Sequence, residues 1–182
     1  DDEGVEDYSR ILNVEYGGAV PRNNYNTPLI SEVFEKTQKI AKFQYLLFIN
    51  TDIILTDSMN EIVSSILEPI GKNAIICGRR TDCILNRHLD FKSDWILDLK
   101  KNVLPVGVQH GFSGIDYMLF SINVPIKLKP FAVGRPGWDN WLLYYAKKNS
   151  ILILDASEVI TVIHQNHKPA YSYKDTETKE SH

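Results

Sequence analysis

The apolar and polar residues of the chain alternate with two different periods. Residues 45–49 and 73–78 are short apolar runs rich in branched and aromatic side chains, which is typical of strands covered on both faces. Residues 29–41 instead repeat apolar side chains at helical spacing after Thr27 and Pro28. That spacing predicts a helix capped by Thr27, with Pro28 at its first position.

The rest of the chain continues this alternation. Further helices are predicted over residues 57–67, over residues 95–101 and from Trp138 onward, and further strands over residues 115–120, 151–155 and 159–163. Alternating strands and helices favour an α/β fold with a mostly parallel central sheet flanked by helices. We assign residues 1–168 to this domain and residues 169–182 to a polar C-terminal tail.

A polar step interrupts the apolar pattern after residue 49. Asn50, Thr51 and Asp52 follow the apolar run directly, and Ile53 restores the apolar pattern at once. An ionised carboxylate between apolar segments is costly to desolvate unless a cation or hydrogen-bond donors meet it. Ligand sites of parallel α/β sheets lie beyond the carboxyl ends of strands. Asp52 is therefore a candidate ligand-binding residue, and the alternative is that it caps a turn or the next helix.

The segment Gly-Arg-Pro-Gly-Trp-Asp-Asn-Trp at residues 134–141 joins a glycine-flanked turn to the start of a helix. Asp139 lies near that start, where the helix macrodipole favours an ionised carboxylate. The lead-in carries the cation Arg135 and more flexible positions than a cap requires, which indicates a binding loop. The alternatives are that Asp139 or Asn140 caps the helix and that the tryptophans pack in the core, as we expect for Trp141.

Two histidines follow the strand predicted at residues 159–163. Zinc prefers three or four protein ligands, so His164 and His167 alone make a weak zinc site. One histidine joining Asp52 around Mn²⁺ or Mg²⁺ is more plausible, because these ions accept carboxylate and phosphate oxygens. The alternative is that both histidines are surface residues at a strand end.

Composition narrows the classes of function. The chain has 182 residues, of which 43% are hydrophobic, and this suits one domain with a sizeable core. The net charge of -3 and the scattered basic residues indicate no nucleic-acid partner. No transmembrane stretch, signal peptide or Asn-x-Ser/Thr acceptor is present, and the spacing of Cys77 and Cys83 fits neither a zinc knuckle nor a disulfide framework. We expect Cys77 in the core and a cytoplasmic location.

Five short motifs occur in an order that resembles GT-A-type nucleotide-sugar glycosyltransferases. The resemblance covers about residues 10–168. It implies a GT-A-like three-layer sandwich, and transfer of a sugar from a UDP- or GDP-sugar donor to a glycan or glycoconjugate acceptor, with inversion. The motifs are Asn-Thr-Asp at 50–52, Gly-Arg-Arg at 78–80, Gly-Ile-Asp-Tyr at 114–117, the segment at 134–141 and Val-Ile-His-Gln-Asn-His at 162–167.

The resemblance also implies roles for individual residues. In this family an Asp-x-Asp motif binds a divalent metal; here Asn50 replaces the first aspartate and Asp52 remains as the ligand, completed by His164 or His167. Asp139 is the expected general base. Contacts with the donor and its phosphates are expected from Asn50, Thr51, Asp52, Arg79 and Arg135, and contacts with the acceptor or sugar from Asp116, Trp138 and Asn140.

One departure from the family pattern leaves two other functions open. GT-A domains begin with a strand, a helix and a second strand that hold the base, and we expect this N-terminal part to be missing before Asp1. That gap and Asn50 favour an inactive module that binds carbohydrate or nucleotide. A metal-dependent phosphohydrolase is the other alternative, although a two-metal site needs more convergent carboxylates.

Overall fold

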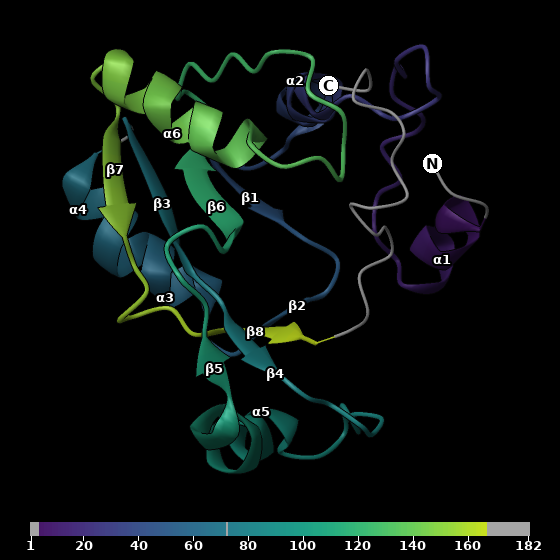
Figure 1. Ribbon diagram of the computed structural model, residues 1–182, viewed down its shortest axis with the longest axis vertical. Helices are drawn as coiled ribbons and strands as arrows, with labels where there is room; N and C mark the ends of the chain where they lie inside the picture. The colour runs from purple at the N-terminus through teal and green to yellow at the C-terminus, as the bar shows by residue number, and fades with distance from the viewer. Residues whose placement is uncertain (1–3, 72, 167–182) are drawn as a thin grey trace.

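Two four-stranded sheets form the frame of the molecule, seen in a computed structural model that describes residues 4–71 and 73–166 (Figure 1). The predicted tail at residues 169–182 and His167 lie outside the described residues. The strands are β1 Tyr45–Ile49, β2 Ile53–Leu55, β3 Ala74–Arg79, β4 Thr81–Cys83, β5 Val108–Gln109, β6 Ile115–Ser121, β7 Leu152–Asp155 and β8 Val162–Gln165. The α-helices are α1 Val5–Ile11, α2 Ile30–Ile40, α3 Met59–Ile62, α4 Glu68–Ile70, α5 Trp95–Asp98 and α6 Trp138–Lys148.

Both sheets are mixed and mostly antiparallel, so the expected GT-A-like sandwich with a mostly parallel central sheet is wrong. The first sheet has the order β1-β6-β3-β7, and β6 runs antiparallel to both of its neighbours. The second has the order β2-β8-β4-β5. One parallel pair occurs in each sheet, between β3 and β7 and between β4 and β8.

The direction of β6 follows from the path of the chain between β3 and β6. That stretch builds β4, the helical segment after Trp95 and β5, instead of a crossover helix on the first sheet. The chain re-enters the first sheet where it left it, since Arg79 pairs with Ile115. A strand that starts beside the end of its neighbour must run back antiparallel. Apolar runs report burial on both faces and carry no information on strand direction.

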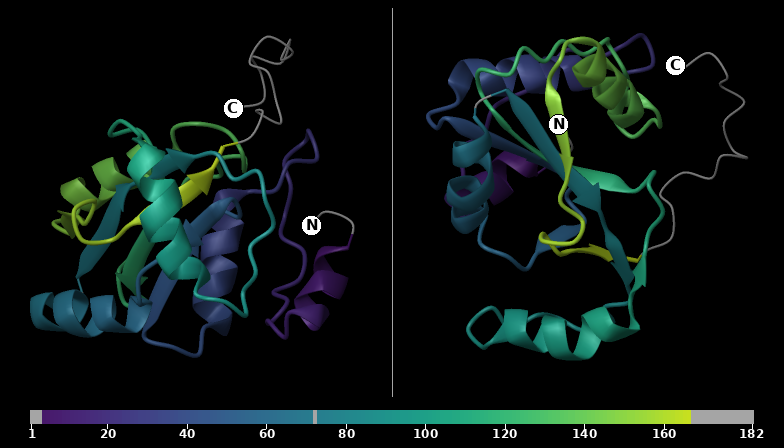
Figure 2. Two further views of the ribbon diagram at one scale, coloured as in Figure 1. Left: turned by 90° about the horizontal axis from the view of Figure 1, so that it is seen from below. Right: turned by 90° about the vertical axis from the view of Figure 1, so that its left-hand side faces the viewer.

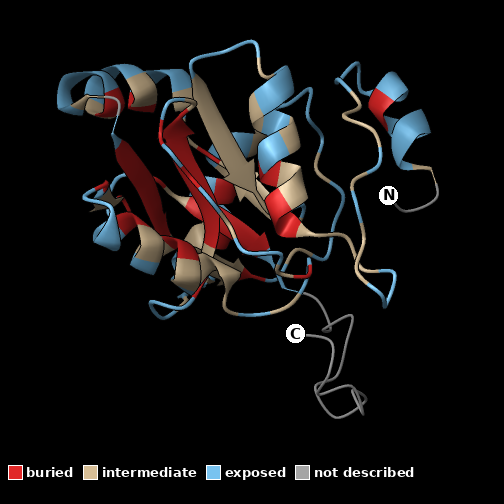
Figure 3. Cartoon of the chain, turned by 90° about the horizontal axis from the view of Figure 1, so that it is seen from above, coloured by how far each residue is buried: buried red, intermediate tan, exposed pale blue. Residues whose placement is uncertain are grey.

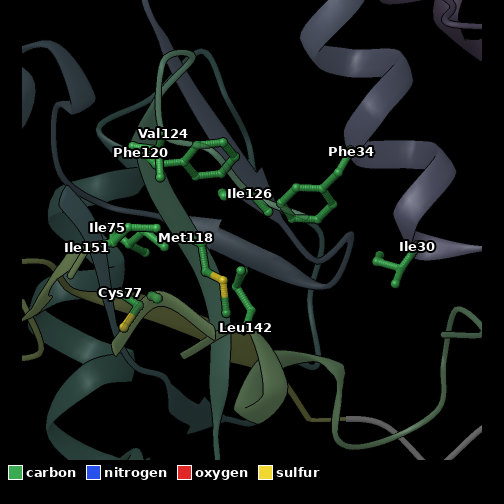
Figure 4. Packing of buried hydrophobic residues seen from close by; sticks show 11 residues of the cluster. Ile30, Phe34, Ile75, Cys77, Met118, Phe120, Val124, Ile126, Leu142 and Ile151 are labelled. Atoms are coloured by element: carbon green, nitrogen blue, oxygen red, sulfur yellow. The ribbon is translucent and has the colours of Figure 1, made fainter. Parts of the chain in front are cut away.

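Helices cover both faces of the first sheet, and side chains alternate between the two. On one face, Phe34 of α2 stacks on Phe48 and Phe120 with ring centroids 5.3 and 5.8 Å apart. Figure 4 shows Phe34 and Phe120 with Leu142 of α6 in this cluster. On the other face, the helical segment of α3, the π-helical turn η1 Val63–Leu67 and α4 packs against alternate residues of the same strands. Figure 3 shows the buried strands between these layers. Cys77 lies in the first cluster, which confirms its predicted core position.

The second sheet is covered on one side by a helical segment. This segment starts with α5 and continues as a π-helical turn, η2 Leu99–Val103, and a 3-10 turn, η3 Leu104–Val106. Leu99 is fully buried against Ile163 of β8, and the segment lies below the second sheet in the right view of Figure 2. Within residues 4–71 and 73–166, no helix combines the length and apolar content that crossing a membrane requires.

Two predicted element starts are wrong by a few residues. Helix α2 begins at Ile30, with Leu29 as its N-cap and no side-chain cap. The residues before Ile30 instead pair with the segment before α6, since Val133 N donates to Pro28 O at 2.9 Å. The last strand begins at Val162, not at residue 159. Ile160 N donates to Ala156 O at 2.8 Å and extends the preceding turn. His164 consequently lies inside β8.

The contact between Tyr117 and Gly78 yields a stability prediction. The Tyr117 hydroxyl is buried and accepts or donates no hydrogen bond among the described residues, and a Cβ on Gly78 would collide with it. Gly78→Ala should cost about 1–3 kcal/mol of unfolding free energy by overpacking. Tyr117→Phe should stabilise by up to about 1 kcal/mol, since an unpaired buried hydroxyl is costly, and should recover part of the Gly78→Ala loss.

Urea unfolding of the two single variants and the double variant measures this coupling. An interaction free energy above about 0.5 kcal/mol is expected for residues in contact. Strictly additive effects would contradict the contact.

Candidate functional site

Six polar side chains form a continuous network between the end of β1 and the second sheet. We call this set the polar network. It joins residues from four separate stretches of the chain. The members are Asn50, Asp52, Arg80, Asp82, Asp116 and His164.

The first half of the polar network is centred on Asp116. Its side chain is 9% exposed and accepts hydrogen bonds from Asn50 Nδ2 at 2.5 Å and from Arg80 NH1 at 2.7 Å. Arg80 Nε donates to Asp82 Oδ1 at 2.8 Å, so one guanidinium serves two carboxylates. Burial alone would lower the pKa of Arg80, but the hydrogen bond and charge of Asp116, together with Asp82, outweigh burial and raise that pKa.

The second half of the polar network is centred on His164, whose side chain is 10% exposed. Its Nδ1 lies 2.8 Å from Asp82 Oδ1 and its Nε2 lies 3.3 Å from Asp52 Oδ2. The imidazole ring therefore stands between two carboxylates. Nδ1 donates to Asp82 in one tautomer and Nε2 donates to Asp52 in the other.

Strand pairing brings these side chains together. Asp82 and His164 are direct partners in the parallel pair β4–β8, and His164 is opposite Ile53 in the antiparallel pair β2–β8. The backbone of Asp52 is tied to β8 by Gln165 N, which donates to Asp52 O at 3.2 Å. The backbone of Asn50 donates to Asp116 O at 3.0 Å. The ends of both sheets therefore meet at the polar network.

Asp52 and His164 have the spacing of two ligands of one metal ion. Ligands about 2.1 Å from an ion lie roughly 3.0–3.4 Å apart at octahedral or tetrahedral angles. The observed separation of 3.3 Å between Asp52 Oδ2 and His164 Nε2 falls in this range. In the described part of the chain, no group of three or more His, Cys, Asp or Glu residues is arranged to hold a metal. The described residues therefore supply two candidate ligands, Asp52 and His164.

The predicted phosphate-binding residues are only partly brought together. Asn50 and Asp52 belong to the polar network, and Thr51 is exposed between them. Arg79 lies apart from the network, because its Nε contacts Ser157 and its guanidinium pairs with the carboxylate of Glu158. Arg135 is half-buried in the segment before α6, and its side chain makes no hydrogen bond or ion pair with other described residues.

The predicted acceptor and base residues lie at the start of α6, apart from Asp116. Trp138 packs edge-on against Phe34 and Phe48 in the core, with its centroid 4.9 Å from that of Phe48. Asp139 is half-buried and Asn140 exposed, and the N-cap of the helix is Gly137, with no side-chain cap. The capping alternative for Asp139 and Asn140 is thus not seen. Trp141, expected in the core, is half-buried and stacks on Tyr145.

Sequence reasoning missed Asp82 and underrated Arg80. Strand β4 has three residues, of which Cys83 alone is apolar, so it shows no apolar run. The available signal was the i, i+2 spacing of Arg80 and Asp82 directly after a buried strand. Residues two apart in an extended chain share a face, which places a cation and a carboxylate side by side.

Comparisons of the chain with protein-family models, with curated proteins and with solved structures find no match. The function of the polar network is therefore inferred from its geometry and chemistry.

The burial of Asp116 predicts a large stability cost on its removal. Asp116→Ala leaves Arg80 without one of its two carboxylates and Asn50 without its acceptor, and breaking a buried ion pair costs about 3–5 kcal/mol. Urea unfolding measures the loss. Glu15→Ala breaks the exposed pair with Lys42 and serves as control, with an expected cost of about 0–1 kcal/mol. Equal costs for the two variants would contradict a structural role of Asp116.

Proposed function

We propose that this chain is a metal-dependent glycosyltransferase that moves a sugar, with inversion, from a UDP- or GDP-sugar to a hydroxyl of a glycan or glycoconjugate. The observation that carries the proposal is the placement of His164 between Asp82 and Asp52. Histidines that bind metals commonly donate their second ring N–H to a carboxylate, which fixes the ring. Asp82 is within hydrogen-bond distance of Nδ1, and the 3.3 Å separation between Asp52 Oδ2 and Nε2 supports Asp52 as the proposed second ligand.

The donor set favours Mn²⁺ or Mg²⁺. Asp52 and His164 would hold the ion, and the oxygens of a diphosphate would be further ligands, as is usual for Mg²⁺ bound with phosphates. When bound, the ion would neutralise charge that develops on the departing diphosphate. Arg80 holds Asp82 and Asp116 in place and so orients His164 indirectly. Arg135 makes no ion pair with the described residues, and we assign phosphate contact to it. Thr51, next to Asp52, is assigned to the same donor site.

Asp139 is the proposed general base for the acceptor hydroxyl. Its carboxylate makes no hydrogen bond or ion pair within residues 4–71 and 73–166, and the helix it starts is capped by Gly137 instead. Trp138 packs on Phe48, two residues before Asn50, which places the first turn of α6 over the end of β1. An uncommitted, half-buried carboxylate there is available to take a proton from a bound hydroxyl.

Two structural features bear on the alternative functions. Asn50 donates its amide hydrogen to Asp116, and an aspartate at position 50 would place two carboxylates in contact. The hydrogen bond to Asp116 therefore explains Asn50, the residue that favoured an inactive module, without a loss of activity. A two-metal phosphohydrolase needs several converging carboxylates around both ions, whereas Asp82 and Asp116 are bonded to Arg80.

The metal pair generates the first functional prediction. Mn²⁺ with UDP or GDP should raise the melting temperature, because a ligand of the folded state stabilises by about 2.7 kcal/mol at 100 times its Kd. Asp52→Ala should abolish the metal-dependent part of the shift. Asp82→Asn should weaken metal affinity about 10–100-fold, the usual effect of losing the partner that orients a ligating histidine. Thermal melting with and without Mn²⁺ measures all three.

Asp94→Ala is the matched control, since Asp94 is exposed and makes no side-chain cap at α5. It should retain the full shift. No Mn²⁺-dependent shift of the wild type with either diphosphate would overturn the proposed donor site.

The role of Asp139 generates the second functional prediction. Asp139→Asn should preserve the Mn²⁺-dependent shift but lower the transfer rate about 10²–10⁴-fold, the range that general-base catalysis contributes. Consumption of the sugar nucleotide is measured, and NMR reads the anomer of the product.

Lys147→Ala changes an exposed side chain in the last turn of the same helix and should transfer at nearly the wild-type rate. A retained anomeric configuration, or full activity of Asp139→Asn, would refute Asp139 as the base of an inverting reaction.

A further inference from the structure

Phe112 is a large apolar side chain held beside the polar network yet left 76% exposed. It lies in the short loop that joins β5 to β6. This loop is tied to Arg80 at both ends: His110 N donates to Arg80 O at 2.9 Å, and Arg80 N donates to Gly114 O at 3.3 Å. Because Arg80 is a member of the polar network, these bonds anchor the loop backbone beside the network, and the Phe112 ring itself lies against Arg79.

The loop gives the Phe112 ring a defined position. Gly114 N donates to Gly111 O at 3.0 Å, which closes a turn with Phe112 and Ser113 at its corners. The His110 ring packs over Gly114, where any Cβ would collide with it. The Arg79 guanidinium lies 4.7 Å from the Phe112 ring centroid and backs the ring. The exposed remainder of the ring is open to a ligand, and little conformational entropy remains to be lost on binding.

The charges around the ring disfavour an anionic ligand. Arg79 NH2 is 3.7 Å from Glu158 Oε1, and the Glu158 side chain is 89% exposed. Asp155 lies behind the same arginine and shares its partner Ser157; hydrogen bonds from the Ser157 hydroxyl and amide lower the pKa of Asp155 and keep it ionised. One cation thus faces two carboxylates. A phosphate would be repelled there, whereas a neutral polyhydroxylated ring meets an apolar face and hydrogen-bond acceptors.

We propose that Phe112, backed by Arg79, is a stacking platform for a sugar ring of the acceptor, and that Glu158 accepts hydrogen bonds from the hydroxyls of that ring. The assignment deepens the proposed transferase function and rests on it for the identity of the sugar as acceptor. The pyranose presents its C–H face to the aromatic ring, as apolar surface packs on an aromatic side chain. The negative surroundings of Arg79 separate this subsite from the diphosphate near Asp52.

Saturation-transfer NMR on the full 182-residue chain tests the platform directly. The probes are the methyl glycosides of glucose, galactose, mannose and N-acetylglucosamine. At least one glycoside should receive saturation on its ring C–H protons. Phe112→Ala should weaken its binding about tenfold or more, because the ring loses most of its apolar contact area. Phe112→Trp should retain binding.

Phe43→Ala removes an equally exposed phenylalanine, 78% exposed, that precedes β1. It should bind the glycoside as the wild type does. Unchanged binding by Phe112→Ala, or no saturation of any glycoside by the wild type, would overturn the platform.

Thermal melting of the same variants separates the two proposals. Phe112→Ala should keep the Mn²⁺-dependent shift with UDP. If the variant loses both glycoside binding and this shift, the substitution damages the whole protein, and a specific role for the ring is overturned. If glycoside binding depends on Phe112 while the wild type shows no Mn²⁺-dependent shift, the platform stands and the transferase function fails. If Phe112→Ala weakens UDP-glucose but not UDP, the ring holds the donor sugar and the acceptor assignment is wrong.

Discussion

The rest of the structure depends on the ion pairs that Arg80 makes with Asp82 and Asp116. Arg80 stands where β3 of the first sheet passes into β4 of the second, and its two carboxylates come one from each sheet. The guanidinium fork can serve both because its donors point in fixed directions. It thereby links the two sheets through side-chain hydrogen bonds. Because Asp82 also holds His164, the same cation positions the side chain on which the proposed metal site is built.

Much of the fold follows from local pattern, and the errors have one common source. The apolar runs located β1, β3, β6 and β7 nearly to the residue. Strand direction depended instead on where the chain goes after Arg79, and the second sheet depended on three-residue strands such as β2 and β4 that carry no periodic signal. Pairing of Arg79 with Ile115 is a long-range event, and a local pattern cannot report it.

The candidate site also has a part that local sequence pattern predicts and a part that it does not. Asp52 and His164 were found because a charged side chain at the edge of an apolar run must have a partner, and the structure makes them partners of each other. Asn50 looked like a defect in a motif, but its amide is required opposite Asp116. Arg79 was preferred to Arg80 for phosphate contact. Position at a strand end alone gives no basis for ranking two neighbouring arginines. Their side chains diverge, and each takes a different set of carboxylates.

The charges of the polar network give a physical reason for a divalent ion. The polar network holds three carboxylates, those of Asp52, Asp82 and Asp116, and one guanidinium, that of Arg80, which bonds to the last two. In the proposed function, a dication between Asp52 and His164 would add positive charge beside Asp52 and would leave the contact between the ring and Asp82 in place. Positive charge stabilises partly buried carboxylates, and this is the physical argument for including a divalent ion in the proposal.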